Sequence, residues 1–241
     1  STAVVTLAAV ENALRITGKN MADLSIVISG VGAAGVAIGK ILLGAGATKI
    51  VGVDSKGAVY DGRDGLNSWK QWFAENTNPE KLTGSLSELM PGADVFIGLS
   101  GPDLITRDDV IAMAKDPIVF AMANPDPEIT PEAARAARSD VIVATGRSDY
   151  PNQVNNVLCF PFIFRGALDA RASRINDAMK IAAVEAIRGL VKEPVPAEVL
   201  TAAGVSALTF GKDYVIPKPM DARLLPRVAR AVALAAVASG V

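Results

Sequence analysis

Short apolar runs alternate with stretches of helical periodicity, and this alternation constrains the fold more than any other feature of the sequence. Five such runs are present, at Ser25–Ser29, Lys49–Val53, Asp94–Leu99, Ile118–Met122 and Val141–Ala144. Strands with apolar side chains on both faces are buried on both, which is typical of a parallel sheet covered by helices. The sequence therefore predicts an α/β fold with a doubly wound parallel sheet flanked by helices, its core at about residues 20–150.

The remaining segments read mostly as helix. Thr2–Ile16 has helical periodicity, and a further helix is expected in the polar stretch Ser55–Leu82, around its two tryptophans. From about Asn152 to residue 241 the pattern is mainly helical, which predicts a helical C-terminal part. The apolar run Ala231–Ala238 is far shorter than the roughly 20 residues of a membrane span, so we expect a packed terminal helix.

Charge and rare residues exclude several classes of function. The 24 basic and 25 acidic side chains give a net charge of −1, so we expect neither a nucleic-acid nor a membrane partner. Without any histidine, the chain cannot hold a histidine-based catalytic triad or metal site. The only cysteine, Cys159, cannot form an internal disulfide, which favours a cytoplasmic location.

A glycine fingerprint follows the first apolar run. Gly30, Gly32 and Gly35 stand between a predicted strand and a predicted helix, and Asp54 ends the next strand at 54 − 35 = 19 residues beyond Gly35. This context is typical of the Rossmann-type dinucleotide site, where the glycines permit a tight turn, a close approach to pyrophosphate, and helix–strand packing. The alternative is a closely packed turn without a ligand.

The residues after the second strand leave the choice of dinucleotide open. An acidic residue at Asp54 suits the ribose hydroxyls of NAD, whereas Lys56, next to Ser55, suits the extra phosphate of NADP. Lys56 is equally consistent with a solvated turn. We lean slightly towards NADP.

Polar side chains follow three later strands. Ser100, Asn124 and Thr145 stand where strands end, so we expect them to line one crevice at the carboxyl edge of the sheet. Four amides in Asn152–Asn156 precede an apolar segment and suggest a helix start with spare hydrogen-bonding groups. Asn124 is also consistent with a turn cap, and the amides of Asn152–Asn156 with a multiply capped helix.

Together these segments resemble bacterial malic enzyme over essentially the whole chain. The resemblance is carried by Ser29–Gly35, Val53–Gly57, Ala123–Pro125 and Ala144–Asn156. It implies oxidative decarboxylation of malate to pyruvate and CO2, with NADP or NAD and with Mg or Mn in the complete enzyme. The segment Phe210–Pro219 is similar to the longer bacterial type, in which a phosphotransacetylase-like domain follows.

The resemblance also implies roles for individual residues. It places the pyrophosphate at the glycine turn, the adenosine ribose after the second strand, Ser100 near the cofactor, and the asparagines near nicotinamide or malate. The cofactor-binding set is Gly30, Gly32, Ala33, Ala34, Gly35, Asp54, Ser55, Lys56, Ser100 and Asn124, and the substrate-binding set is Asn124, Asn155 and Asn156.

The family's catalytic and metal-binding segments have no counterpart here. Its catalytic Tyr and Lys and its acidic metal ligands precede a segment of which only Ser1–Ala3 is present. We therefore expect no catalytic residue and no metal ligand, and interpret residues 1–241 as an NAD(P)-binding domain, inactive alone, whose N-terminal catalytic half lies elsewhere in a homo-oligomeric enzyme. The alternatives are a domain of another amino-acid or hydroxy-acid dehydrogenase, or a non-catalytic nucleotide-binding module.

Overall fold

The computed structural model describes residues 1–241, which divide into two units. One unit contains Ala13–Pro151 and holds the sheet, and the other combines Ser1–Asn12 with Asn152–Val241 and is helical. Helix α1 (Thr2–Thr17) crosses the boundary between Asn12 and Ala13. We call these the sheet unit and the helical unit.

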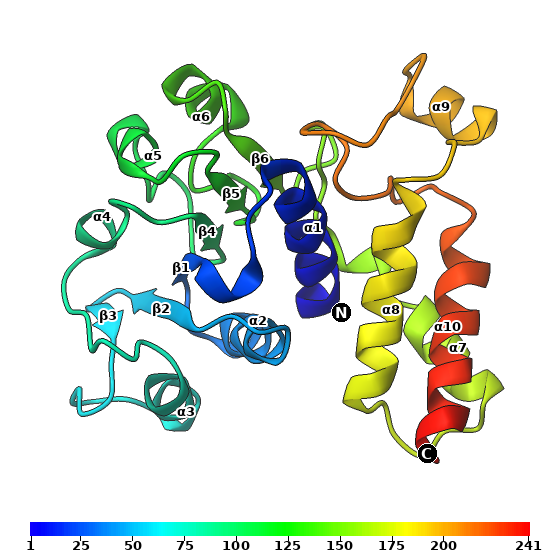
Figure 1. Cartoon of the computed structure of the whole chain (residues 1–241), viewed down its shortest axis with the longest axis horizontal. Helices are drawn as coiled ribbons and strands as arrows, with labels where there is room; N and C mark the ends of the chain where they lie inside the picture. The colour runs from blue at the N-terminus through cyan, green and yellow to red at the C-terminus, as the bar shows by residue number, and fades with distance from the viewer. The chain divides into compact units, whose positions relative to one another are not determined.

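The sheet unit contains a six-stranded sheet in the order β3-β2-β1-β4-β5-β6 (Figure 1). The strands are β1 Ser25–Ser29, β2 Lys49–Asp54, β3 Gly57–Val59, β4 Val95–Gly98, β5 Ile118–Ala121 and β6 Ile142–Thr145. Five strands run parallel, which confirms the predicted doubly wound sheet. The sixth, β3, was not predicted and pairs antiparallel with β2. The chain changes direction across the sheet between β1 and β4, where ligands bind in folds of this type.

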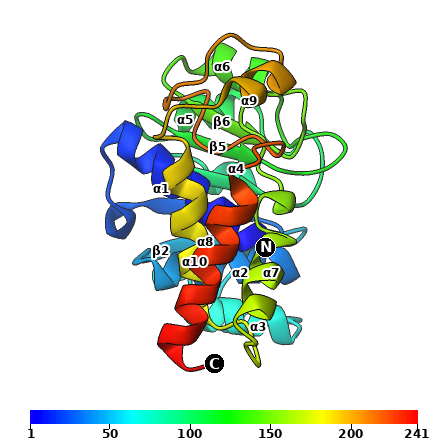
Figure 2. The same ribbon diagram turned by 90° about the vertical axis from the view of Figure 1, so that its right-hand side faces the viewer.

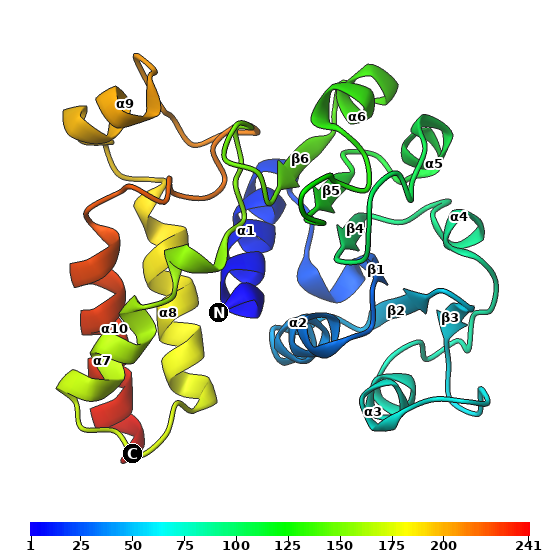
Figure 3. The same cartoon turned by 180° about the vertical axis from the view of Figure 1, so that it is seen from behind.

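Helices cover both faces of this sheet. The helical elements of the sheet unit are η1 Met21–Asp23, α2 Ala33–Gly44, α3 Ser68–Asn76, α4 Leu86–Leu89, α5 Arg107–Ala112 and α6 Pro131–Ala137. Helices α2 and α3 lie on one side, and α4, α5 and α6 lie on the other (Figures 1 and 3). Capping side chains fix the starts of α5 and α6, since Thr106 accepts from the Asp109 amide and Thr130 from the Ala133 amide.

Alternating strand residues build two apolar layers. Val27, Phe96 and Val119 point to the α4–α6 face and join one buried cluster. On the other face the ring of Phe73 in α3 lies so close to Gly39 and Gly52 that a methyl group at either would come within 2.7 Å of it. Glycine at these two positions therefore lets α3 pack against α2 and β2.

The helical unit contains η2 Asn156–Leu158, α7 Phe162–Asp169, α8 Asp177–Leu190, α9 Ala197–Ala203 and α10 Leu224–Ser239. Helices α8 and α10 lie side by side in both views (Figures 1 and 2). Helix α7 approaches α10 at Gly166, where an added methyl group would lie 2.4 Å from the Ala229 carbonyl oxygen. Helix α10 confirms the predicted C-terminal helix. No helix in the chain has the length and apolar character needed to cross a membrane.

The N-terminal residues join this unit through polar contacts. The side chain of Asn12 donates to the carbonyl oxygens of Arg188 at 3.1 Å and Val215 at 2.8 Å. Glu11 forms an ion pair with Arg188. The second half of α1 is thereby tied to the end of α8 and to the segment before α10.

Candidate dinucleotide site

The glycine turn joins the end of β1 to the start of α2. Gly30 has φ +109°, a conformation that favours glycine, and its amide donates to the Val53 carbonyl at 2.9 Å. A methyl group at Gly35 would lie 2.0 Å from the carbonyl oxygen of Gly30. The predicted roles of Gly30 in a tight turn and Gly35 in close packing therefore fit the local geometry.

The first turn of α2 is open to solvent. Gly32, Ala33 and Ala34 are exposed, and a methyl group at Gly32 would meet no atom within 4 Å. The first amides of a helix have no acceptor within the helix, and they carry a partial positive charge. This exposed helix start suits an anionic group such as a pyrophosphate.

Asp54, at the end of β2, is held by two basic side chains. Its carboxylate accepts from Arg63 at 2.5 and 3.0 Å and from Lys70 at 2.7 Å, and it also accepts from the Lys56 amide at 2.9 Å. Only 8% of its side chain is exposed. Burial alone raises the pKa of this carboxyl group, but the hydrogen bonds from Arg63, Lys70 and the Lys56 amide outweigh it, so the pKa lies well below its usual range.

Arg63 and Lys70 were missed in the sequence analysis. Arg63 lies in the loop after β3, where it also donates to the carbonyls of Gly57 and Ala58, and Lys70 lies in α3. Neither stands at a spacing from Asp54 that predicts contact. With Asp54 they form what we call the acid–base cluster, whose net charge is +1.

The predicted residues Ser55 and Lys56 are exposed beside this cluster. They line a cavity of about 640 Å³ together with Tyr60, Arg63, Asp64 and residues 83–85. A methyl group added at Gly65 would lie 3.7 Å from the Lys56 Nζ, so the ammonium group reaches towards the loop after β3. The cavity is thus bordered by the basic side chains of Lys56 and Arg63 and by the acidic side chain of Asp64.

The structure brings Ser100 next to the glycine turn. Its hydroxyl lies 3.2 Å from that of Ser29, and a methyl group at Gly30 would lie 2.8 Å from it. Asn124, exposed after β5, lies against Gly146, where a methyl group would come within 2.9 Å of the Asn124 amide nitrogen. Side-chain contacts therefore join the end of β1 to the end of β4, through Ser29 and Ser100, and the end of β5 to the end of β6, through Asn124 and Gly146.

Thr145 does not line this edge, contrary to expectation. It is fully buried, and its hydroxyl accepts from the Arg147 amide at 3.1 Å. Because its side chain is used within the turn after β6, the predicted role at an open crevice is wrong.

A buried glutamate at the same edge was also missed. Glu128 is fully buried between the ends of β4 and β5, where its carboxylate accepts from the amides of Ser100 at 3.2 Å and Ala123 at 3.1 Å. Burial raises the pKa of this carboxyl group, although both amide hydrogen bonds oppose the shift. The sequence around it, a proline-rich loop, reads as an ordinary turn.

The asparagines of the helical unit have different surroundings. Asn152 is buried, donates to the Lys212 carbonyl at 2.7 Å and accepts from the Val215 amide at 3.0 Å. Asn155 caps η2 by accepting from the Val157 amide, and Asn156 is exposed. The predicted helix start is this short 3-10 turn, with α7 beginning only at Phe162.

No three acidic, cysteine or histidine side chains in the chain come together in a way that could hold a metal ion. At the carboxyl edge, Asp54 and Glu128 are engaged with basic groups and backbone amides, and Asp126 lies 3.7 Å from the Arg147 guanidinium. The residues present thus fit a dinucleotide but do not fit a divalent metal.

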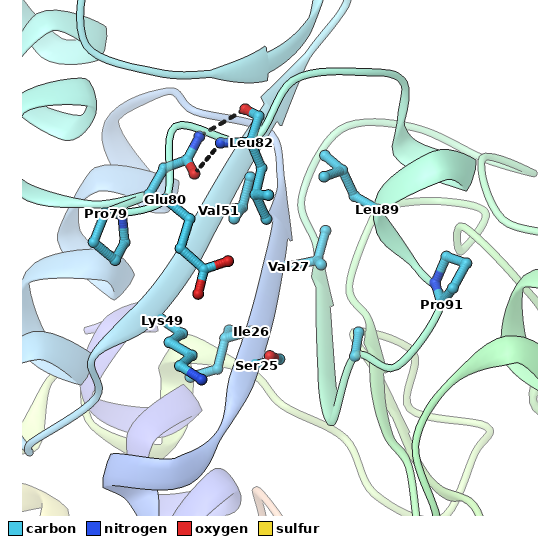
Figure 4. Close-up of a pocket in the computed structure, with 12 residues that line it drawn as sticks. Ser25, Ile26, Val27, Lys49, Val51, Pro79, Glu80, Leu82, Leu89 and Pro91 are labelled. Carbon is cyan, nitrogen blue, oxygen red and sulfur yellow. Dashed lines mark hydrogen bonds between the residues drawn. The ribbon is translucent and has the colours of Figure 1, made fainter.

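A second cavity, of about 190 Å³, lies at the opposite edge of the sheet. Ser25 and Lys49, the first residues of β1 and β2, lie at one side of it, and Val27, Leu82 and Leu89 line its apolar part (Figure 4). It is therefore separate from the strand ends that form the candidate site.

Comparison with known proteins identifies the family. The profile described as "Malic enzyme, NAD binding domain" matches residues 1–206. An NADP-dependent malic enzyme of Halomonas elongata is 55% identical, over 100% of this chain and 56% of the relative. A probable NADP-dependent malic enzyme of Rickettsia prowazekii is 53% identical, over 100% of this chain and 31% of the relative.

A solved structure agrees with these relatives. The NAD-dependent malic enzyme of Thermotoga maritima superposes with a TM-score of 0.85 at 40% identity, covering 96% of this chain and 57% of that one. The chain spans between about a third and just over half of the proteins it matches. It belongs to the malic enzyme family, in which it matches the NAD-binding domain.

Proposed function

We propose that the sheet unit binds a nicotinamide dinucleotide with its pyrophosphate at the start of α2. The observation that carries this proposal is the contrast between two glycines. At Gly35 the protein's own packing requires glycine, because the Gly30 backbone leaves no space for a side chain. At Gly32 no protein atom would contact an added methyl group. A glycine in open space at an exposed helix start is explained by the close approach of a ligand.

We further propose that NADP is the preferred dinucleotide. The Asp54 carboxylate already accepts from Arg63 and Lys70, which leaves it poorly available to the ribose hydroxyl of NAD. The cluster carries a net positive charge. The adjoining cavity is lined by Lys56 and also by Asp64, so the positive charge available to a ligand is that of the cluster. An added phosphate dianion would therefore gain charge-assisted hydrogen bonds that NAD cannot make.

In the complete protein, this domain would serve the oxidative decarboxylation of malate to pyruvate and CO2. Ser100 and Asn124 would contact the nicotinamide end of the cofactor, and Asn124, Asn155 and Asn156 would contact malate. A base and a divalent Mg or Mn ion, which would accept the hydroxyl proton and stabilise the enolate respectively, would be held by residues outside this chain. We infer a cytoplasmic, homo-oligomeric enzyme.

Calorimetric titration of the purified chain with NADP+ and NAD+ tests the proposal. We expect NADP+ to bind at least tenfold more tightly, since one charge-assisted hydrogen bond contributes about 1.5–3 kcal/mol. Added malate with Mg²⁺ or Mn²⁺ should yield no NADPH. Absence of binding would refute the cofactor assignment, a preference for NAD+ would refute the role of the cluster, and steady turnover would place a complete active site within these residues.

A further inference from the structure

The ends of β4 and β5 are joined by a side chain where their backbone ladder stops. The last backbone bond between them runs from the Met122 amide to the Gly98 carbonyl, at 3.0 Å. Beyond β4, the Leu99 amide donates to the Ser29 carbonyl of β1. The Ser100 amide donates to the carboxylate of Glu128, which also accepts from the Ala123 amide just beyond β5. One carboxylate thus hydrogen-bonds to the backbone after both strands, at a point where the strands no longer form backbone hydrogen bonds with each other.

The glycine at position 98 leaves the space that the Glu128 carboxylate occupies. Glu128 is fully buried, and a methyl group at Gly98 would lie 2.3 Å from its Cδ and 2.5 Å from its Oε1. The backbone on either side is also fixed, because Asp103 and Ile105 donate to the carbonyls of Pro127 and Glu128. A buried carboxylate is costly unless it is well hydrogen-bonded, so its placement here calls for a specific role.

The two amides that Glu128 holds stand beside candidate cofactor contacts. Ser100 itself lies against the glycine turn, and Ala123 directly precedes Asn124, which lies against Gly146. In folds with this strand order, the adenosine half of a dinucleotide lies over β1 and β2, and the nicotinamide half lies over β4 and the strands beyond it. Glu128 therefore acts on the nicotinamide side of the site.

We propose that Glu128 is a positioning residue, which sets Ser100 and Asn124 for the nicotinamide half of the cofactor without touching the cofactor itself. This inference rests on the proposed function. It predicts that a substitution at Glu128 weakens binding of the nicotinamide half of the dinucleotide more than binding of the adenosine half. A residue needed only for stability would, when substituted, weaken binding of both halves equally.

The test compares NADP+ with adenosine 2′,5′-bisphosphate, which contains only the adenosine half, by calorimetric titration of the full 241-residue chain. The Glu128→Gln side chain has nearly the same shape as glutamate but only one acceptor oxygen for the amides of Ser100 and Ala123. We expect the NADP+ affinity of this variant to fall about tenfold, as for the loss of one such hydrogen bond, and its affinity for the bisphosphate to stay within about twofold.

Two other variants secure the interpretation. Gly98→Ala displaces the same carboxylate without altering it and should reproduce the half-selective loss, which keeps the test decisive if Glu128→Gln does not fold. Asp140→Asn is the matched control. Asp140 lies just before β6, at the opposite ends of the strands, and accepts from Arg138 and from the Asp116 amide just before β5. This substitution should lower the melting temperature and leave the ratio of the two affinities unchanged.

The possible outcomes are distinct. Equal losses for both ligands, or no loss for either, would overturn the positioning role while leaving the proposed function intact. If the unsubstituted chain does not bind NADP+, the proposed function fails and this inference fails with it. If Glu128→Gln and Gly98→Ala lose affinity for NADP+ but not for the bisphosphate, the result supports both the proposed function and the positioning role of Glu128.

Discussion

Replacing Gly32 and Gly35 by alanine, one at a time, separates what the glycine turn does for the fold from what it does for the ligand. At Gly35 the new methyl group would lie 2.0 Å from the Gly30 carbonyl oxygen, where ordinary contact begins at 3.4 Å. Because the obstacle is backbone, α2 itself must move. We expect a loss at the upper end of overpacking costs, about 3 kcal/mol, which corresponds to a melting temperature lower by roughly 6–12 °C.

At Gly32 the same change has no such cost. The backbone there has φ −99° and ψ −162°, a conformation open to any residue, and the methyl group meets no protein atom within 4 Å. Stability should therefore stay within about 1 kcal/mol, and a small gain is expected from the reduced freedom of the unfolded chain. A pyrophosphate held back by this methyl group would lose at least one charge-assisted hydrogen bond, or roughly 10- to 100-fold in Kd.

Differential scanning calorimetry with and without NADP+, together with titration calorimetry, measures both effects. Gly32→Asp should remove binding altogether, because its carboxylate would repel the pyrophosphate. The reasoning would be refuted if Gly32→Ala bound NADP+ as tightly as the unsubstituted chain, or if Gly35→Ala melted at an unchanged temperature.

Other side chains carry predictions that single measurements can check. Lys56→Ala and Lys70→Ala should each weaken NADP+ binding about tenfold and NAD+ binding less than twofold in calorimetric titrations; equal losses would contradict a role in reading the phosphate. The hydrogen bond from Arg138 lowers the pKa of Asp140 to about 2, below its unfolded value of about 3.9, so this stabilisation is complete above the unfolded pKa and is lost as pH falls towards 2. The urea midpoint of Asp140→Asn should accordingly depend less on pH between 5 and 2 than that of the unsubstituted chain, and parallel curves would contradict this. Burial raises the pKa of the Cys159 thiol to about 11, so iodoacetamide should modify the folded chain at pH 8 only as fast as it unfolds; rapid labelling followed by mass spectrometry would show otherwise.

The sequence predicted the parallel sheet because the information is local. Each buried strand is a run of apolar residues, and the starts of α5 and α6 are marked by Thr106 and Thr130. Strand β3 escaped prediction because three residues, Gly57–Val59, form no periodic pattern. Its pairing with β2 is visible only once the turn at Ser55 and Lys56 brings the chain back.

The candidate site was only partly predictable, for the same physical reason. The glycine turn is contiguous, so its residues could be named from the sequence. The partners of Asp54 come from a loop and from α3, and Glu128 reaches between two strands from a loop of ordinary turn composition. Such contacts depend on tertiary packing, which brings together residues whose spacing along the chain has no fixed meaning.

The division of α1 between two units bears on the order in which the chain folds. The bonds from Asn12 to Arg188 and Val215 span 176 and 203 residues, so the helical unit cannot be completed until both ends of the chain exist. The sheet unit, continuous from Ala13 to Pro151, meets no such delay during synthesis. Once the sheet unit has folded, Asn12 and Asn152 are connected by a compact domain instead of a long flexible loop. Bringing the two segments of the helical unit together then costs less conformational entropy. The first twelve residues are thus made before the sheet unit and find their partners after it.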